Sequence, residues 1–194
     1  MNGISRKLVL KSLNEFYDDA RLMDPPVETP NEPEFRAYNI LTHLRDPDII
    51  WSTELLPLSV ITSPLLQSAL RLHSLAQNAN HARGEKVTIN GWSRFFKLLA
   101  QPEIPYLFAC ILSTHFNDIR VGALRSMKMA YIPQHSAYPI RTLANVLGCD
   151  DEEEAIGLCE ACGLDVTAGA GAPTVELHRT LSLIGRSHAL LDCR

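Results

Sequence analysis

The sequence predicts a mainly α-helical protein, in which a bundle of helical repeats is followed by a C-terminal winged helix with a small β-hairpin. Apolar residues recur at intervals of three and four along most of the 194-residue chain, and proline-marked turns separate the periodic stretches. Near the C-terminus two short apolar runs flank a glycine-rich loop, which is the pattern of a hairpin. We expect a helical-repeat domain over residues 1–116 and a winged-helix domain over residues 117–194.

Residues that favour helix starts precede each periodic stretch of the first 116 residues. In order, they are Ser5, Asn31 (with Glu34 in capping-box spacing), Asp46-Pro47, Ser63-Pro64, Asn90 and Pro105. The helices that they open are short, and none could bury its apolar face alone. We therefore expect these helices to stack in pairs, as in a right-handed helical solenoid.

The winged-helix prediction rests on three helices followed by two strands. The expected helices begin at Asn117 or Asp118, at Pro139 and at Asp150, and the second and third end at Gly148 and Gly163. Asp150 and Glu153 have the spacing of a capping box. Residues 164–167 and 174–177 are the expected strands, and the glycine-rich loop over residues 168–173 is the expected wing tip.

Charge is strongly segregated along the chain, although the net charge is only −4. Residues 86–149 hold seven basic and two acidic residues, a net charge of +5, whereas residues 150–176 hold eight acidic residues and no basic one. Six of these basic residues are candidate nucleic-acid contacts: Arg94, Lys97, Arg120, Arg125, Lys128 and Arg141. Residues 94 and 97 share a helix face, and so do residues 125 and 128.

Clustered cations of this kind would bind phosphates without reading bases, with an affinity that falls as salt rises. The alternative is an ordinary solvated face, or pairing with the acidic helix that follows. The third expected helix begins with five acidic residues, which phosphate would repel. Sequence-specific reading of a major groove is therefore not expected.

The sequence offers no candidate for catalysis or for metal binding. Cys159 and Cys162 have the spacing of a metal or redox motif, but no second ligand pair follows, so core packing is their expected role. The acidic run at residues 150–154 fits the first turn of a helix rather than a calcium loop. We expect no enzyme, no cofactor and no small-molecule substrate. We also expect no membrane span, no signal peptide and a reducing compartment.

Several runs resemble segments of the germinal-centre-associated nuclear protein (GANP) family, whose yeast member is Sac-three. They cover residues 11–21 (KSLNEFYDDAR), 31–41 (NEPEFRAYNIL), 104–112 (IPYLFACIL), 115–120 (HFNDIR) and 150–160 (DDEEEAIGLCE). The runs fall in family order over roughly residues 8–178. Family members usually carry a further helical stretch upstream of the first run, so the resemblance covers part of the family module.

This resemblance implies a PCI-type module, in which helical repeats end in a winged helix, from the scaffold subunit of the TREX-two messenger RNA export complex. It implies pairing with a second PCI-domain subunit, which a small acidic protein supports, and binding of RNA or other single-stranded nucleic acid through the six basic residues. It also implies a place in the nucleus, at the nuclear envelope and pore. The alternative is a structural PCI subunit of a proteasome-lid or signalosome-like particle with no nucleic-acid role.

Overall fold

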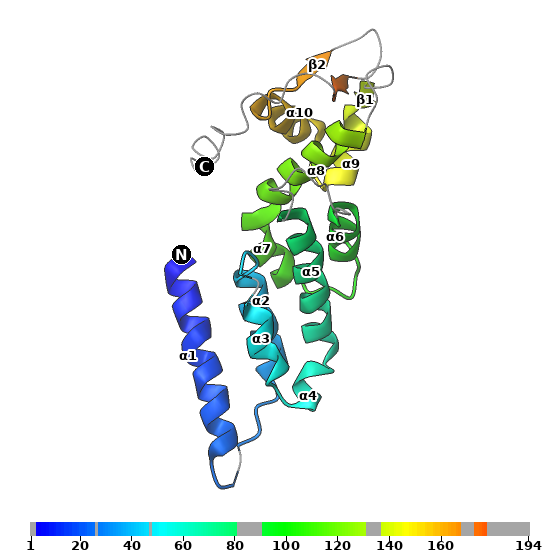
Figure 1. Ribbon diagram of the computed structural model, residues 1–194. Coiled ribbons are helices and arrows are strands. Elements are labelled where there is room, and N and C mark those ends of the chain that lie inside the picture. The colour runs from blue at the N-terminus through cyan, green and yellow to red at the C-terminus, as the bar shows by residue number, and fades with distance from the viewer. Residues whose placement is uncertain are drawn as a thin grey trace.

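Two hydrophobic cores, which share one long helix, organise the chain (Figure 1). The computed structural model describes residues 3–25, 27–46, 48–80, 91–130, 137–167 and 173–177. Helices make up most of this part, and a small antiparallel sheet follows them, so the predicted mainly helical fold class is confirmed. No helix in these ranges combines the length and the apolarity that crossing a bilayer requires.

The first core is built by helices from the N-terminal part of the chain. They are α1 (Gly3–Leu22), α2 (Glu32–Thr42), α3 (Ile49–Glu54), α4 (Leu58–Ile61), α5 (Pro64–Asn80), α6 (Trp92–Leu99) and α7 (Tyr106–Leu112). Helices α2 and α5 pack together at its centre, and α1 packs on α2 (Figure 1). Ile40 and Leu41 of α2, Leu66 and Leu72 of α5, and Phe108 of α7 are fully buried. Burial of each such side chain contributes about 1.5–3 kcal/mol to folding.

A buried network of charged side chains holds α1 against α2. The Glu32 carboxylate is 2% exposed and accepts hydrogen bonds from Arg21 of α1 and from Arg36. Arg36 also donates to Asp18 of α1, over 2.6 Å. Because the charges are paired across the two helices, the cost of removing them from water is offset. One face of α1 is thereby fixed to the rest of the molecule.

Helix α8 belongs to both cores. The 3₁₀ turn Ser113–His115 runs directly into α8 (Phe116–Ala130), so Asn117 and Asp118 lie in the first turn of this helix and are not its caps, contrary to the prediction. Ile119 is buried in the first core. Later in the same helix, the second core buries another three residues: Ala123, Leu124 and Met127. The division of the chain after residue 116 stays a prediction.

A three-stranded sheet and two helices complete the second core. They are β1 (Ala137–Pro139), α9 (Ile140–Leu147), α10 (Glu152–Ala161), β2 (Asp165–Thr167) and β3 (Thr174–Glu176). Strand β3 is central and pairs antiparallel with both β1 and β2, so that the buried Val175 lies between Tyr138 and Val166. Starting with α8, the order is helix, strand, two helices and two strands, which is the order of a winged helix. The predicted hairpin of β2 and β3 is confirmed, and its loop tip, residues 168–172, lies outside the described residues.

The sequence places the proline-marked helix starts well. Helix α5 begins at Pro64, and helices α7 and α9 directly follow Pro105 and Pro139. Helix α3 begins only at Ile49, later than Asp46-Pro47 predicts, and Pro47 itself lies outside the described residues. A proline restricts its own backbone angle but does not fix how many residues the preceding turn takes.

Two predicted capping contacts in the first core are absent. Ser5 lies inside α1 and does not cap it. Asn31 precedes α2 as predicted, but its side chain makes no capping hydrogen bond, and Glu34 accepts the hydroxyl hydrogen of Tyr38 instead. The predicted cap Asn90 lies outside the described residues.

A capping box opens α10, one residue later than the sequence predicts. Asp151, not Asp150, is the cap: its Oδ1 accepts a hydrogen bond from the backbone N–H of Glu154 over 2.7 Å. The Glu154 carboxylate in turn accepts from the backbone N–H of Asp150 over 2.9 Å. The predicted pair, Asp150 and Glu153, and the observed pair, Asp151 and Glu154, have the same spacing. The sequence alone therefore cannot show which pair forms the capping box.

Gly148 ends α9 in a conformation that other residues rarely adopt. Its φ is +61°, and a Cβ at this position would lie 2.8 Å from Cδ1 of Phe96 in α6. The glycine thus allows α9 to end in close contact with the first core. Gly163, with a φ of +71°, similarly ends α10, and the sequence predicts both glycines as helix ends.

We expect Gly148→Ala to destabilise the protein by about 1–3 kcal/mol, because alanine adds both a strained φ and a clash with Phe96. Gly157→Ala is the matched control, since this exposed glycine lies inside α10 with open space around it. The control should stabilise by about 0.5–1 kcal/mol. Urea unfolding followed by circular dichroism measures both, and equal effects of the two substitutions would contradict the role given to Gly148.

Candidate nucleic-acid interface

Five of the six predicted basic residues lie on the surfaces of three helices that adjoin one another. Arg94 and Lys97 are on α6, Arg125 and Lys128 on α8, and Arg141 is in the first turn of α9. Lys128 is half-buried and the other four are exposed. Helix α6 contacts both α8 and α9. Among the described residues, none of these five side chains forms an ion pair with a carboxylate.

The core fixes the direction in which these cations point. On α8 the buried residues Ile119, Ala123 and Met127 recur every four positions, which defines the inward face. Arg125 is two positions from Ala123 and from Met127, which is about 200° around the helix axis. Arg125 therefore lies on the exposed side of α8, although its charge is near enough to Cys162 of the second core to oppose, in part, the rise in the pKa of that thiol.

Arg120 does not belong to this surface, although it lies on the same helix. It is only 5% exposed. Its Nε donates to the carbonyl of Leu147 over 3.1 Å, and its Nη2 donates to the carbonyl of Gly148 over 2.5 Å. Its Nη1 forms an ion pair with Glu154 over 2.6 Å, and the guanidinium lies 5.6 Å from the ring centroid of Phe116. These bonds use the donors that a phosphate would need, so we remove Arg120 from the expected nucleic-acid contacts.

The acidic start of α10 has a structural role and limits where a nucleic acid can bind. Glu154 serves the capping box and pairs with Arg120. Glu152 and Glu153 remain exposed in the first turn of the helix, where the helix dipole favours negative charge. These carboxylates would repel phosphate, so a polyanion would bind from the side of α6, α8 and α9 and not from the side of α10.

Cys159 and Cys162 are free thiols that pack in the second core, as expected from the sequence. Cys159 is fully buried and Cys162 is 4% exposed. Burial raises the pKa of the Cys159 thiol to about 12 and also raises the pKa of Cys162. Metal ligation and thiol exchange both need the thiolate, which this environment disfavours. The described ranges also hold no group of three or more His, Cys, Asp or Glu residues placed to bind a metal ion.

A second group of basic side chains was not predicted from the sequence. Arg6 and Lys7 of α1, Arg45 after α2 and His115 of the 3₁₀ turn help to line a pocket of about 440 Å³. Burial, and then the charge of Arg45, lower the pKa of His115, so its ring is neutral near pH 7. Arg45 pairs with Asp118. These residues lie far apart in the chain, so no spacing pattern in the sequence could have grouped them.

Comparison with known proteins gives a consistent result over most of the chain. The pattern of the SAC3/GANP family matches residues 6–168. SAC3 family protein 1 of Schizosaccharomyces pombe (strain 972 / ATCC 24843) is 40% identical over 181 residues, which are 90% of this chain and 18% of that protein. Protein xmas of Drosophila melanogaster is 29% identical over 173 residues, which are 87% of this chain and 8% of that protein. The chain therefore spans less than a fifth of the length of either relative.

We expect Arg120→Gln to destabilise the protein by about 2–4 kcal/mol, because it removes charge-assisted hydrogen bonds and leaves the carbonyl of the buried Leu147 without this donor. The expected loss of stability stays within this range because Glu154 is half-exposed, so water weakens its ion pair with Arg120. Arg125→Gln, the same change five residues along the helix on the exposed face, should alter the unfolding free energy by no more than about 0.5 kcal/mol. Chemical unfolding of the two variants under identical conditions tests the contrast. Similar losses in both would contradict the structural role of Arg120.

Proposed function

Because this chain belongs to the SAC3/GANP family, we propose that it is a non-enzymatic scaffold module that binds RNA or other single-stranded nucleic acid and pairs with a second PCI-domain subunit. In this proposal the module is of the PCI type and ends in a winged helix. It works within a TREX-two-like complex in messenger RNA export, in the nucleus and at the nuclear pore. A small acidic protein supports the partner subunit.

One observation carries the nucleic-acid part of the proposal: five cations lie on adjoining helices without carboxylate partners in the described residues. They are Arg94, Lys97, Arg125, Lys128 and Arg141, and all lie within the stretch that matches the family. Exposed Lys and Arg side chains bind phosphates by releasing counterions, which needs no particular base sequence. The acidic start of α10, where a winged helix would read bases, supports binding without sequence preference.

The small sheet supports the pairing part of the proposal. Strands β1 and β2 each pair with the central β3, so they are the two outer strands of the described sheet. The outer strand of a sheet is a position at which another chain can pack. A second winged helix that packs beside this one would cover such an edge and would align its own basic surface with the cations of α8 and α9.

We expect the double substitution Arg125→Glu and Lys128→Glu to weaken binding of single-stranded RNA about tenfold or more, by a similar factor for different sequences. Two lost phosphate contacts should also reduce the slope of log affinity against log salt by about 1.4. Fluorescence anisotropy with labelled oligonucleotides at several salt concentrations measures both quantities.

The matched comparison is between single substitutions. Arg71 is an exposed arginine on α5, outside the proposed surface, and Arg71→Glu changes the net charge by as much as Arg125→Glu. Only Arg125→Glu should weaken binding and lower the salt slope. Unchanged affinity in the double variant, or equal losses in the two single variants, would count against the surface. Absence of any salt-sensitive RNA binding would favour the lid-like or signalosome-like alternative.

We expect the chain to co-elute with its PCI-domain partner when the two are co-expressed with the small acidic protein. Gel filtration with light scattering should give a single species with the summed mass of all three. Because Arg125 and Lys128 lie on helix surfaces and not at the sheet edges, their substitution to Glu should leave this assembly intact. Separate elution of the unmodified chain would contradict the pairing, whatever the result for RNA.

A further inference from the structure

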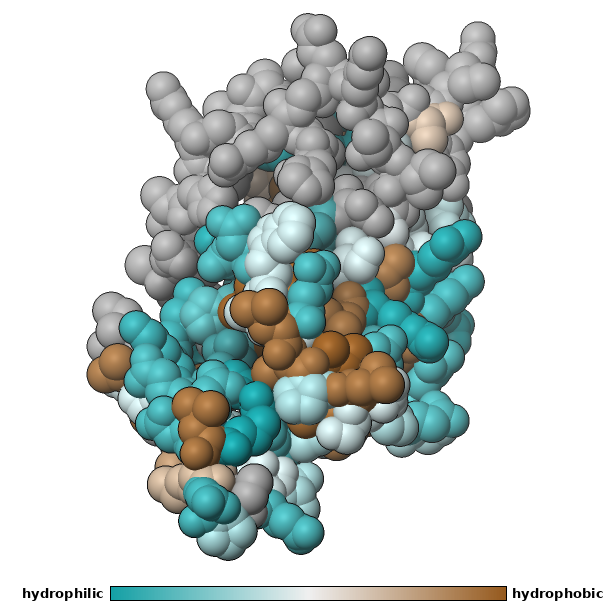
Figure 2. Space-filling view, turned by 60° about the horizontal axis from the view of Figure 1, so that its bottom comes forward, coloured by the Kyte–Doolittle hydropathy of each residue, from teal (hydrophilic) through white to brown (hydrophobic). Residues whose placement is uncertain are grey.

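The end of the molecule that α3 and α4 form carries an exposed apolar patch, the α3–α4 patch. It consists of Trp51, which is 68% exposed, Leu55, which is 88% exposed, and Leu58, which is 75% exposed. Figure 2, which looks onto this end, shows apolar side chains gathered there with hydrophilic ones around them. The two helices are anchored beneath the patch, because Thr53 and Val60 are buried and α4 contacts both α2 and α5. Three large apolar side chains exposed side by side on anchored helices are typical of an interaction site.

The charged residues of this segment are all acidic. Residues 46–70, which include the whole of α3 and α4, hold three acidic residues and no lysine or arginine. Asp48 comes directly before α3 and Glu54 is the last residue of α3, and both are exposed. Within the described ranges neither of these two carboxylates forms an ion pair. The apolar patch is therefore accompanied by negative charge that the fold itself does not neutralise.

The carboxylate of Glu54 occupies a position that is unfavourable within the chain. It ends α3, and the last turn of this helix contains no basic residue. The final carbonyl groups of a helix carry partial negative charge, so a cation is favoured beside them and a carboxylate is not. A lysine or arginine from another molecule would pair with Glu54 and contact these carbonyls at the same time. The position thus fits a cationic partner.

The same charges disfavour other occupants of the patch. A second copy of this chain would bring Asp48 and Glu54 close to the same two carboxylates, and like charges in contact oppose binding. The phosphates of RNA and of an anionic bilayer would be repelled in the same way. A protein segment that combines apolar side chains with lysine or arginine is complementary to the patch in both respects.

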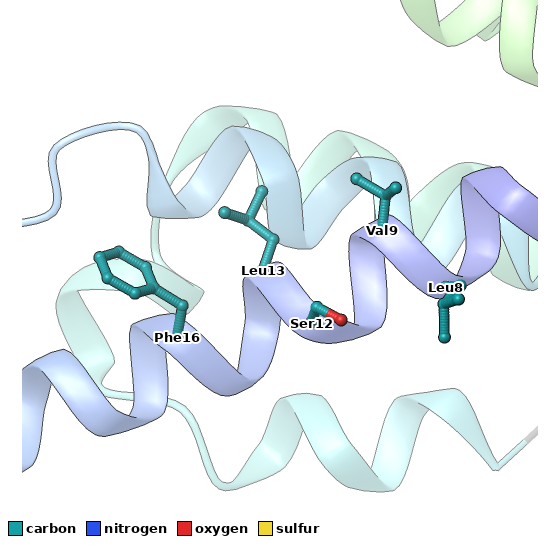
Figure 3. Close-up of a pocket in the computed structure, with 5 residues that line it drawn as sticks. All are labelled: Leu8, Val9, Ser12, Leu13 and Phe16. Carbon is teal, nitrogen blue, oxygen red and sulfur yellow. The ribbon is translucent and has the colours of Figure 1, made fainter.

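The apolar residues on α1 lack this charge pattern. A pocket of about 440 Å³ on that helix is lined by Leu8, Val9, Ser12, Leu13 and Phe16 (Figure 3). The charged residues beside the pocket have both signs, and Lys11 pairs with Glu15 over 3.9 Å. Charges that are matched within one helix select no particular class of partner, so the α3–α4 patch alone carries the charge argument.

We propose that the α3–α4 patch binds a basic amphipathic helix of a partner protein. The apolar side of that helix packs on Trp51, Leu55 and Leu58, and lysines or arginines beside this side pair with Asp48 and Glu54. Tryptophan is among the residues that contribute most to protein interfaces, and burying an exposed indole removes a large apolar area from water. The patch belongs to the first core and is separate from the cations of α6, α8 and α9, so one chain can bind this partner and RNA together.

The first test titrates the protein with three synthetic helical peptides. All three carry leucines three and four positions apart, and their other positions are lysine in one, glutamine in the second and glutamate in the third. The chain has two tryptophans, so Trp92→Phe leaves Trp51 as the single fluorescent reporter. The lysine peptide should shift the emission of Trp51 to shorter wavelength, because the indole becomes buried. The glutamine peptide should bind about tenfold more weakly, and the glutamate peptide should not bind. In Trp51→Phe, the remaining Trp92 should show no shift.

The second test compares patch variants with matched controls in the Trp92→Phe protein. Leu55→Ser and Glu54→Gln should each weaken binding of the lysine peptide about tenfold, since one removes an apolar contact and the other removes a charge pair. Leu8→Ser, at a leucine of α1 that is 64% exposed, and Glu152→Gln, at an exposed glutamate of α10, should leave the affinity unchanged. Circular dichroism checks that each variant is folded.

Three results would overturn the proposal. They are an emission of Trp51 that the lysine peptide does not shift, equal binding of the lysine and glutamine peptides, and equal losses in the patch variants and their controls. Dimerisation of the unmodified chain that Leu55→Ser abolishes would assign the patch to a second copy and would also overturn it. Arg125→Glu should bind the lysine peptide like the unmodified protein, so failure of the RNA proposal and failure of this one are distinguishable.

Discussion

The guanidinium of Arg120 connects α8 to the end of α9 and the start of α10, and the arrangement of the second core depends on this contact. It donates to the final carbonyls of α9 and to Glu154 in the first turn of α10. A cation at a helix C-terminus and a carboxylate at a helix N-terminus both complement the helix dipole, so one side chain stabilises two helix ends at once. Its burial is possible because carbonyl oxygens, a carboxylate and the ring of Phe116 replace the water that the guanidinium gives up.

This constraint divides the cations of α8 into two kinds. Arg120 points inward and is part of the fold, whereas Arg125 points outward and Lys128 is half-buried. Not all of the basic residues that cluster in the sequence therefore contribute to the charge of the surface. Pairing between the basic and acidic segments does occur, through Arg120 and Glu154, and the remaining cations are left without carboxylate partners within the described ranges. The proposed RNA-binding surface consists of these remaining cations.

Helix α1 is fixed to α2 by the Arg36, Glu32 and Asp18 network, whereas its Leu8, Val9 and Phe16 are exposed. The sequence predicts a helix here from its apolar periodicity. It cannot show that α2 covers only part of the apolar arc, because coverage depends on which helix lies next to it and at what angle.

Features that depend on residues a few positions apart could be predicted from the sequence, because local backbone geometry dictates them. These are the helical periodicity, the proline-marked starts of α5, α7 and α9, the glycine ends of α9 and α10, the hairpin of β2 and β3, and the burial of the two spaced cysteines. Features that join distant residues could not be predicted in this way. Strand β1 is three residues long, too short to show a period, and forms because β3 lies beside it. The pocket lined by Arg6, Arg45 and His115 exists only where three elements meet. The inward role of Arg120 has the same origin, since a basic residue on a helix becomes a surface charge or a structural ion according to what packs against it.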